Sequence, residues 1–303
     1  MIADLRALEP PQLESFTNSL VEQVVAAVTD KIPHLESSLA VAELTVALHY
    51  VLNTPEDVLV WDVGHQGYIH KALTGRMEEL VNMRKPGGLS GFLKRDESPY
   101  DFFGAGHAST SISALAGVCL ADQVSGKSRQ RVAVIGDGSL TGGQSFEALN
   151  HLGSLGADAL VIINDNEGSI DATIGALHHQ QSYGTYVQSL GWQYTFLEQG
   201  NDVRALVEAL QHVLAQPGPQ TLHIKTKRPD LSPPKSYKPG TTFQWWAAET
   251  MGVVLEKNLD IQLLSPAMFA GSGFGPLREL YPNRLIDTGI NEAHTVSAAA
   301  GIV

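Results

Sequence analysis

Two short stretches of the sequence carry residue types that could hold a metal ion and a diphosphate. Residues 136–139 (Gly-Asp-Gly-Ser) and residues 164–168 (Asn-Asp-Asn-Glu-Gly) each follow directly on a short apolar run. Such runs predict buried strands of a parallel sheet, and ligands bind where these strands end. Asp137 and Asn166 offer oxygen atoms, which suit Mg²⁺, and Mg²⁺ is usually bound together with phosphate groups. The two stretches therefore predict a magnesium and diphosphate site.

A helix is expected directly after the first of these strands. Residues 143–155 place Phe146, Leu149 and Leu152 at helical spacing, so that one face would pack inward. The N-terminus of this helix would add backbone N–H donors for a diphosphate. A lone Gly-Asp-Gly is usually a turn, and two unrelated turns are the alternative interpretation. Because both stretches stand at strand ends, the pair favours the metal and diphosphate site.

The composition is typical of a soluble globular protein with a hydrophobic core. The 303 residues are 43% hydrophobic and 17% charged. The net charge of −12 argues against nonspecific nucleic-acid binding, and no apolar run approaches the length of a membrane span. The N-terminal residues lack an apolar signal core, so a cytoplasmic protein is expected. Cys119, the single cysteine, lies in an apolar helix-like stretch and is expected to be a packed core thiol.

Alternating helices and strands predict an α/β fold. The sheet is expected to be mainly parallel, with helices on both faces. Residues 86–107 are rich in glycine, proline and charge and have no period, which predicts a long functional loop. Besides the central strands and the helix at 143–155, the elements expected in the first part of the chain are helices at 11–30, 36–50, 110–122 and 203–214, and strands at 58–62, 192–196 and 220–226.

The chain is expected to contain two modules. Residues 228–240 include four prolines and a glycine, which predicts a linker over 228–242 between a module at 1–227 and the start of a second at 243–303. The second module would be incomplete, because so few elements leave sheet edges exposed unless a partner covers them. Its expected elements are helices at 245–257 and 292–301 and strands at 261–264 and 284–287.

Ordered motifs over nearly the whole chain resemble the 1-deoxy-D-xylulose-5-phosphate synthase family, which is related to transketolase. The resemblance covers about the first half of that family's length. The motifs are Glu43-Leu-Thr-Val-Ala-Leu-His-Tyr, Trp61-Asp-Val-Gly-His-Gln, Gly87-Gly-Leu, Gly106-His-Ala-Ser-Thr-Ser-Ile-Ser, Gly136-Asp-Gly, Asn164-Asp-Asn-Glu, Thr226-Lys, Ser265-Pro-Ala-Met and Asn291-Glu-Ala-His.

The resemblance implies a thiamine-diphosphate-binding fold and a transferase of isoprenoid biosynthesis. Family members bind thiamine diphosphate and Mg²⁺ between a pyrophosphate-binding module and a pyrimidine-binding module. They decarboxylate pyruvate and join the two-carbon remnant to glyceraldehyde 3-phosphate. On this resemblance, residues 1–227 correspond to the pyrophosphate-binding module and residues 243–303 to the opening of the pyrimidine-binding module.

The family's site residues carry over to matching positions in this chain. Asp137, Asn166 and the backbone carbonyl of Gly168 match the metal ligands, and Glu292 matches the glutamate that hydrogen-bonds the pyrimidine ring. The alternative for Glu292 is a solvated acid at a helix start. The implied cofactor-binding residues are His65, Gly106, His107, Ser109, Gly136, Asp137, Gly138, Ser139, Asn164, Asn166, Lys227 and Glu292.

Three histidines match positions around the reacting carbon and the cofactor. His34, His65 and His107 are candidate catalytic residues beside Glu292, since histidine transfers protons near neutral pH. Simpler interpretations stay open for Ser109 as a helix cap and for Asn164 as a residue that closes the turn. Lys227 could equally be an exposed lysine at a strand end. The histidines expected to be structural are His49, His151, His178, His179 and His223.

Departures from the family pattern leave the substrate and the assembly open. The connection at 172–190 is short, Arg-Pro-Asp-Leu-Ser follows Lys227 where the family has a glycine-rich run, and the chain ends within the pyrimidine-binding module. A second subunit or a missing segment is therefore expected to complete the enzyme, and the chain alone is expected to hold half of the cofactor site. Transketolase-like ketol transfer and a non-catalytic scaffold subunit remain alternatives, whereas a nucleotide-binding Rossmann protein lacks its early glycine motif.

Overall fold

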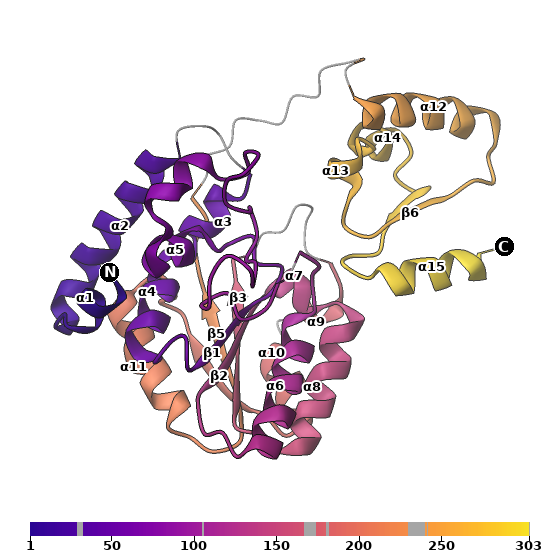
Figure 1. The fold of residues 1–303 in the computed structure, drawn as a ribbon. Coiled ribbons are helices and arrows are strands. Elements are labelled where there is room, and N and C mark those ends of the chain that lie inside the picture. Colours follow the sequence, from indigo (N-terminus) through magenta and orange to yellow (C-terminus); the bar gives the residue numbers. More distant parts are fainter. Residues whose placement is uncertain are drawn as a thin grey trace.

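The computed structural model describes residues 1–28, 33–104, 106–166, 174–179, 182–229, 240 and 242–302. These residues form two α/β units, one extending through residue 229 and a smaller one beginning at residue 242 (Figure 1). No helix among them has the length and the apolar character needed to cross a membrane.

The first unit is built on a sheet of five parallel strands in the order β1-β2-β3-β5-β4. The register pairs Gly136 at the end of β2 with Asn164 in β3, and it pairs Asp165 with Lys225 at the ends of β3 and β5. The carboxyl ends of these three strands therefore meet at one edge of the sheet. In chain order the strands are β1 (Val58–Trp61), β2 (Arg131–Gly136), β3 (Ala159–Asp165), β4 (Gln193–Leu197) and β5 (Pro219–Lys225).

Helices cover both faces of this sheet, because successive side chains of a strand point to opposite sides. In β2, Val132 and Val134 pack into one hydrophobic cluster, while Ala133 and Ile135 pack into another. The α/β fold predicted from the sequence is therefore confirmed. The elements that supply apolar residues to the first cluster include α2 (Leu13–Ala27), α4 (Ala42–Val51) and α11 (Val203–Leu214), and those of the second include α6 (Ser111–Ser125), α8 (Gly143–Leu155) and α10 (Tyr183–Ser189).

Shorter elements link these helices and strands. Residues 83–104 and 106–110 contain no helix or strand, in agreement with the long loop expected there. The short elements are α1 (Ile2–Arg6), η1 (Pro10–Gln12), α3 (Leu35–Leu39), α5 (Tyr68–Lys71), η2 (Ala72–Arg76), η3 (Glu78–Asn82), α7 (Asp137–Leu140) and α9 (Ala176–His179).

One predicted helix is wrong in its extent. The helix expected over 36–50 is broken into α3 and α4, because Val41 leaves helical torsion angles with φ −115° and ψ 22°. The break allows α3 to pack against α5. The hydroxyl of Ser38 in α3 also donates to the carbonyl of His65, in the loop before α5, over 3.4 Å. Apolar spacing alone did not reveal this turn.

The second unit has a parallel pair of strands and a small core. Strand β6 pairs with β7, with Leu264 opposite Ile286. The core consists of Ala248, Leu255, Phe269, Leu277 and Leu285. In chain order the elements are α12 (Phe243–Lys257), β6 (Leu263–Ser265), α13 (Phe269–Ser272), α14 (Gly275–Leu280), β7 (Leu285–Asp287) and α15 (Glu292–Gly301).

Candidate functional site

The ends of strands β2 and β3 form the centre of the candidate site. Asp137 directly follows β2 at the start of α7, and it is 2% exposed. Asn164 in β3 is buried, and its Oδ1 accepts a hydrogen bond of 2.7 Å from the hydroxyl of Thr226, just after β5. Asn166 follows β3 and is partly exposed. The structure therefore brings Asp137 and the 164–166 turn to the same edge of the sheet.

The chemistry of these groups suits a hard cation. Asp137 supplies carboxylate oxygens and Asn166 an amide oxygen, both of which are Mg²⁺ ligands in proteins. The third predicted ligand, the carbonyl of Gly168, lies outside the described residues. Within the described part of the chain, no group of three or more His, Cys, Asp or Glu side chains is arranged to hold a metal. A magnesium site here would thus rely on the amide and the carbonyl as well as on the carboxylate.

A buried histidine contacts the 164–166 turn through Asp165. His223 on β5 lies with Nε2 3.2 Å from Asp165 Oδ2 and Nδ1 2.7 Å from the hydroxyl of Tyr194 on β4. His223 and Asp165 are both buried. The sequence expectation that His223 is structural agrees with this position, since its two ring nitrogens are occupied by partners within the sheet.

A second histidine lies unexpectedly close to the predicted metal ligand. His178 on α9 places Nδ1 3.6 Å from Asp137 Oδ2 and 2.9 Å from the hydroxyl of Tyr183. The sequence analysis treated His178 as structural, because no motif surrounds it. Its position beside Asp137 is a result of the tertiary structure.

The turn that carries His107 is held by a buried carboxylate at the end of β1. Asp62 is 1% exposed and accepts hydrogen bonds from the N–H groups of Ser109 at 2.9 Å and Ser111 at 3.0 Å. Burial raises the pKa of Asp62, and the amide donors oppose this rise. The hydroxyl of Ser109 donates to the carbonyl of Ser139 over 2.7 Å. Ser109 therefore joins this turn to α7 instead of capping α6, whose N-cap position is Thr110.

Glycines leave open space beside these turns. A Cβ atom added to Gly106 or Gly136 would meet no other atom within 4 Å, and Gly106 has a φ of 143°, which favours glycine. The backbone can therefore be approached closely at both positions. Gly138 and Ser139 lie within α7, directly after Asp137. This geometry fits the predicted diphosphate at the strand tips.

The second unit contributes one predicted residue to the same region. Glu292 begins α15, and its Oε1 lies 3.7 Å from His107 Nε2. Both side chains are exposed, His107 by 67% and Glu292 by 53%. Two predicted site residues that are far apart in the sequence thus lie close together.

The other two predicted histidines form a separate corner of the site. The rings of His34 and His65 lie 5.1 Å apart edge to face, and the ring of Phe92 lies 6.2 Å from His34. Burial, followed by the charges of His34, Arg228 and Arg84, lowers the pKa of His65 to about 3. His65 is therefore neutral at physiological pH, with one ring nitrogen able to accept a hydrogen bond.

Lys227 lies beside the strand tips with an exposed side chain. Its backbone N–H donates to Asn201 Oδ1 over 2.6 Å, so its main chain is held while its ammonium group faces solvent. This position is compatible both with a cofactor contact and with an ordinary exposed lysine.

Sequence reasoning missed Asp62 and His178 as parts of the site. Asp62 stands directly after a predicted strand, within Trp61-Asp62, and this was the signal available for it. For His178 the surrounding sequence offered no comparable signal. Its contact with Asp137 spans two separate elements and depends on the tertiary fold.

Comparisons with known proteins agree on one family. A family model described as 1-deoxy-D-xylulose-5-phosphate synthase matches residues 1–185. The 1-deoxy-D-xylulose-5-phosphate synthase of Alkalilimnicola ehrlichii is 38% identical over 98% of this chain and 58% of its own length. That of Methylobacillus flagellatus is 36% identical over 99% of this chain and 59% of its own length. The chain thus spans a little under three fifths of these curated relatives.

Solved structures with the same fold are transketolases. The transketolase of Leishmania mexicana superposes on 72% of this chain with a TM-score of 0.61 and 22% identity, over 37% of its own length. The transketolase of Campylobacter jejuni gives a TM-score of 0.63 and 19% identity, again over 72% of this chain and over 38% of its own length. At these identities the likeness concerns the fold.

Proposed function

The chain belongs to the 1-deoxy-D-xylulose-5-phosphate synthase family, and we propose that it is the diphosphate-binding part of a transferase dependent on thiamine diphosphate and Mg²⁺. The transferase decarboxylates pyruvate or a similar 2-oxo acid and passes the two-carbon unit to an aldehyde such as glyceraldehyde 3-phosphate. The observation that carries this proposal is the meeting of Asp137, the 164–166 turn, His107 and Glu292 at one edge of the sheet.

The residues that would hold the cofactor's diphosphate lie on the first unit. Asp137 and Asn166 would bind the magnesium ion through oxygen atoms, together with the carbonyl of Gly168. The open backbone at Gly106 and Gly136 leaves room for the diphosphate, and Ser109 ties these two turns together. The N-terminus of α8 faces the same edge after α7 and supplies backbone N–H donors.

The residues that would carry protons lie near this edge of the sheet. When bound, thiamine diphosphate supplies the electron sink that a decarboxylation requires. Glu292 would hold a proton against the cofactor's pyrimidine ring, and His107 Nε2, 3.7 Å from Glu292 Oε1, would need only a small side-chain movement to share that proton directly. His65 stays neutral because burial lowers its pKa to about 3, so it offers one N–H donor and one accepting nitrogen for hydrogen bonds.

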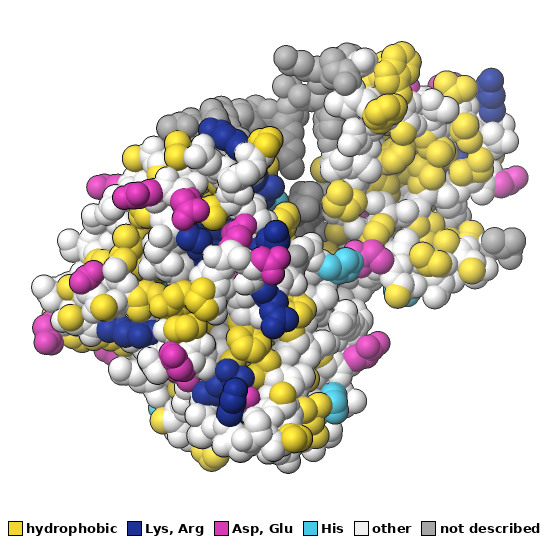
Figure 2. All heavy atoms as spheres, in the orientation of Figure 1, with side chains coloured by type: hydrophobic (Ala, Val, Ile, Leu, Met, Phe, Trp, Pro, Cys, Tyr) yellow, Lys and Arg dark blue, Asp and Glu magenta, His cyan; other side chains and the backbone are white. Residues whose placement is uncertain are grey.

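A second polypeptide, or a further segment of the same protein, would complete the enzyme. The second unit has two strands, and isolated pairs of strands are marginally stable in water. It also exposes large hydrophobic side chains, including Leu280 by 70% and Val296 by 72%, and hydrophobic areas cover much of the face seen in Figure 2. An added α/β segment would bury these residues and continue the sheet.

The test measures cofactor binding and turnover in the assembled enzyme. Proteins that co-purify with the chain from its native source would be identified and combined with it. Calorimetry should then detect thiamine diphosphate uptake that requires Mg²⁺, and the mixture should release CO₂ from pyruvate or another 2-oxo acid. Absence of both would contradict the proposal.

Two substitutions locate these activities in the site. Asp137→Ala should weaken Mg²⁺-dependent cofactor binding by at least about 100-fold, because losing even an outer-shell partner of a metal typically costs 10–100-fold. Glu292→Gln should reduce turnover far more than cofactor affinity. Glu147→Gln and Glu279→Gln change exposed acids on α8 and α14 and serve as controls. Unchanged turnover of Glu292→Gln would favour a scaffold role for this chain.

A ketol transfer like that of transketolase is the second candidate, because the fold superposes on transketolases. A donor screen with ketose phosphates and 2-oxo acids separates the two reactions. Two-carbon transfer from a ketose without CO₂ release would favour the second candidate.

A further inference from the structure

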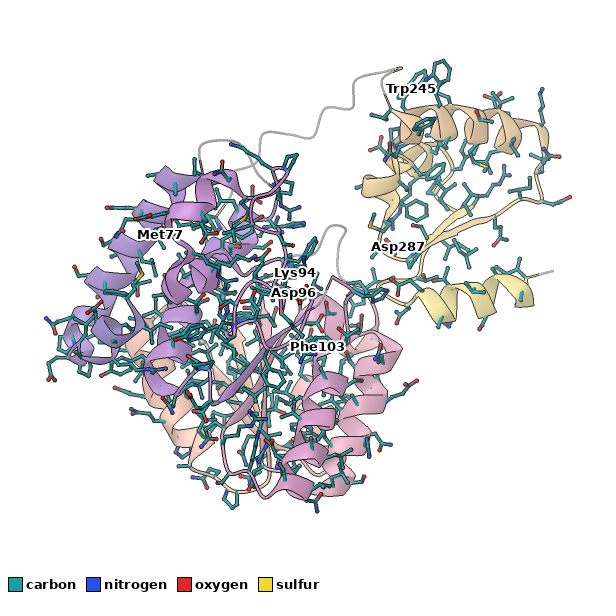
Figure 3. All side chains as sticks on the ribbon, viewed as in Figure 1. Met77, Lys94, Asp96, Phe103, Trp245 and Asp287 are labelled. Carbon is teal, nitrogen blue, oxygen red and sulfur yellow. The ribbon has the colours of Figure 1, made fainter. Side chains whose placement is uncertain are left out.

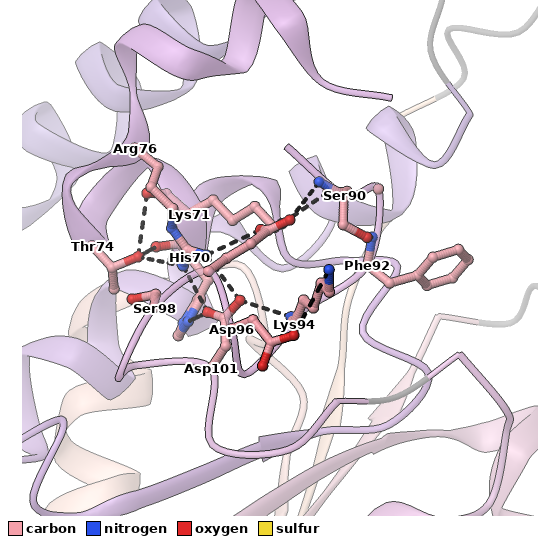
Figure 4. Close-up of polar contacts among 12 residues, drawn as sticks. His70, Lys71, Thr74, Arg76, Ser90, Phe92, Lys94, Asp96, Ser98 and Asp101 are labelled. Carbon is pink, nitrogen blue, oxygen red and sulfur yellow. Dashed lines mark hydrogen bonds and ion pairs between the residues drawn. The ribbon is translucent and has the colours of Figure 1, made fainter. Parts of the chain in front are cut away.

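A buried group of charged side chains lies beneath the long loop of the first unit. We infer that this anchor cluster, formed by His70, Lys71, Arg76, Glu97 and Asp101, positions the loop segment 90–94 against the corner made by His34 and His65. The inference rests on the proposed function, because it gives Glu97 and Asp101 a positioning role in that reaction. Figure 4 shows the cluster and its contacts.

Asp101 links helix η2 to the loop. Its side chain is fully buried and accepts hydrogen bonds from Arg76 at 2.7 and 2.8 Å and lies 3.2 Å from His70 Nε2. Its Oδ2 also accepts the backbone N–H of Lys94 over 2.9 Å. Although burial alone would raise the pKa of Asp101, the hydrogen bonds from His70 and Arg76 hold it well below its usual range. Asp101 is therefore ionised and fixes the loop at Lys94.

Glu97 and Lys71 hold the other end of the segment. Lys71 Nζ lies 2.5 Å from Glu97 Oε2 and donates to the carbonyl of Ser90 over 2.8 Å. Glu97 Oε1 accepts the N–H of Ser90 over 2.6 Å. The lysine and the glutamate thus bind both backbone groups of Ser90. The segment between Ser90 and Lys94 is held at one end by the buried Lys71 and the partly buried Glu97, and at the other by the buried Asp101.

The segment held in this way faces the histidine corner. Phe92 lies at its middle, with its ring 6.2 Å from the ring of His34 and with the guanidinium of Arg84 5.3 Å from the ring centre. Leu93 packs on the loop before α5, where a Cβ atom added to Gly67 would lie 2.6 Å from Leu93 Cδ2. That loop carries His65. The anchor cluster therefore acts on the histidines through Phe92 and Leu93.

These charged residues are better explained by their role in positioning the loop segment 90–94 than by a contribution to the stability of the fold. Replacing a buried ion pair by apolar residues of similar volume is often neutral or stabilising, whereas removing one partner is strongly destabilising. The carboxylates of Glu97 and Asp101 additionally accept backbone N–H groups of the loop, which apolar residues cannot do. The nearby Asp96, by contrast, is 84% exposed and lies 3.9 Å from Lys94, so it contributes little.

The test compares two double variants that remove the same buried ion pair. Lys71→Met/Glu97→Leu leaves no acceptor for the N–H of Ser90, whereas Lys71→Met/Glu97→Gln keeps an amide oxygen there. Asp96→Asn is the matched control, because it turns an acid of the same loop into an amide without touching the cluster. Lys94 and Arg95 provide trypsin sites within the loop. Figure 3 shows that Lys94 and the control residue Asp96 both lie on the first unit.

Four measurements are made on the full chain with thiamine diphosphate, Mg²⁺ and its partner. In Lys71→Met/Glu97→Leu, trypsin should cut after Lys94 or Arg95 at least tenfold faster, because the loop opens more often. The pKa of His65, followed by NMR, should rise from about 3 toward 6.5 as water reaches the corner. Turnover should fall at least tenfold, while cofactor affinity stays within threefold. Asp96→Asn should stay near the unaltered protein in all four. The Glu97→Gln double variant keeps an acceptor for the N–H of Ser90 and loses the bond from Lys71 to its carbonyl, so it should change clearly less than the Glu97→Leu double variant.

Three outcomes would overturn the inference. These are equal losses in both double variants, loss of cofactor affinity together with turnover, and a loop that opens to trypsin while His65 and turnover stay unchanged. If the unaltered complex shows no turnover at all, the proposed function fails instead. Proteolysis and the His65 titration still decide whether the cluster holds the loop against the corner.

Discussion

The two units of this chain differ in how completely their sheets are buried. The first unit has five parallel strands with a hydrophobic cluster on each face, and Leu222 of its strand β5 is fully buried. The second has a two-stranded sheet and a core of five residues. Its Leu280 is 70% exposed and its Val296 72% exposed. We therefore expect the first unit to fold by itself and the second to need further surface to pack against.

The candidate site is divided in the same way. Asp137 and Asn164 are buried at the ends of central strands and are held by neighbouring elements. Glu292 stands at the start of α15 and is half exposed, with His107 of the first unit 3.7 Å away. The half of the site proposed to bind the diphosphate is thus built into a closed core. The half proposed to bind the pyrimidine lies on the smaller unit, whose large hydrophobic side chains are exposed.

The largest expected difference concerns folding of the separated units. A fragment of residues 1–229 should fold and unfold cooperatively, and a fragment of residues 242–302 should be largely unfolded, because its core is too small to offset the loss of chain entropy. Circular dichroism would measure both. Tryptophan fluorescence gives a second measurement. The buried Trp61 and Trp192 report on the first fragment, and the more exposed Trp245 and Trp246 report on the second. A stably folded second fragment would contradict the comparison.

A pair of matched leucine substitutions gives the next largest effect. Leu222→Ala in β5 should lower the free energy of unfolding by about 2–5 kcal/mol, because it removes buried methyl groups and leaves a cavity. Leu280→Ala in α14 removes the same atoms from a largely exposed position and should change it by less than about 0.5 kcal/mol. Urea unfolding of the chain without its partner, followed by circular dichroism, measures both. Equal costs would show that the second unit is packed as well as the first.

The smallest effect concerns acid sensitivity, which should be confined to the first unit. Burial lowers the pKa of His49, His65 and His70. Below about pH 6.5 the unfolded chain therefore binds protons that the folded chain does not, so the free energy of unfolding should fall as the pH falls. For His65 alone the loss between pH 7.5 and 5.5 should be about 1.4 kcal/mol, since its folded pKa of about 3 lies below this window.

His65→Gln tests this slope, because glutamine does not titrate. The variant should lose about 1.4 kcal/mol less than the unaltered chain between pH 7.5 and 5.5, measured by urea unfolding at each pH. His151→Gln changes an exposed histidine of α8 and is the control. An unchanged slope in His65→Gln would mean that His65 is accessible to protons in the folded chain.

Much of the first unit could be predicted from its sequence. The apolar runs before Gly136 and Asn164 are strands β2 and β3, the helix expected at 143–155 is α8, and the helix expected at 203–214 is α11. These predictions succeeded because the periods of strands and helices are read from residues that are close in the chain. The broken helix at Val41 shows the limit, because packing against α5 outweighs local spacing there.

The sequence by itself determined the fold class, the family and the two stretches that place oxygen atoms at strand ends. Each of these depends on residue types in a fixed local order. Only the tertiary structure decided that Asp62 holds the turn before α6, that His178 lies beside Asp137, and that Asp101 and Glu97 fasten the long loop. These contacts join residues on separate elements, and the positions of those elements are set by how the helices pack on the sheet. Local sequence patterns do not specify that packing.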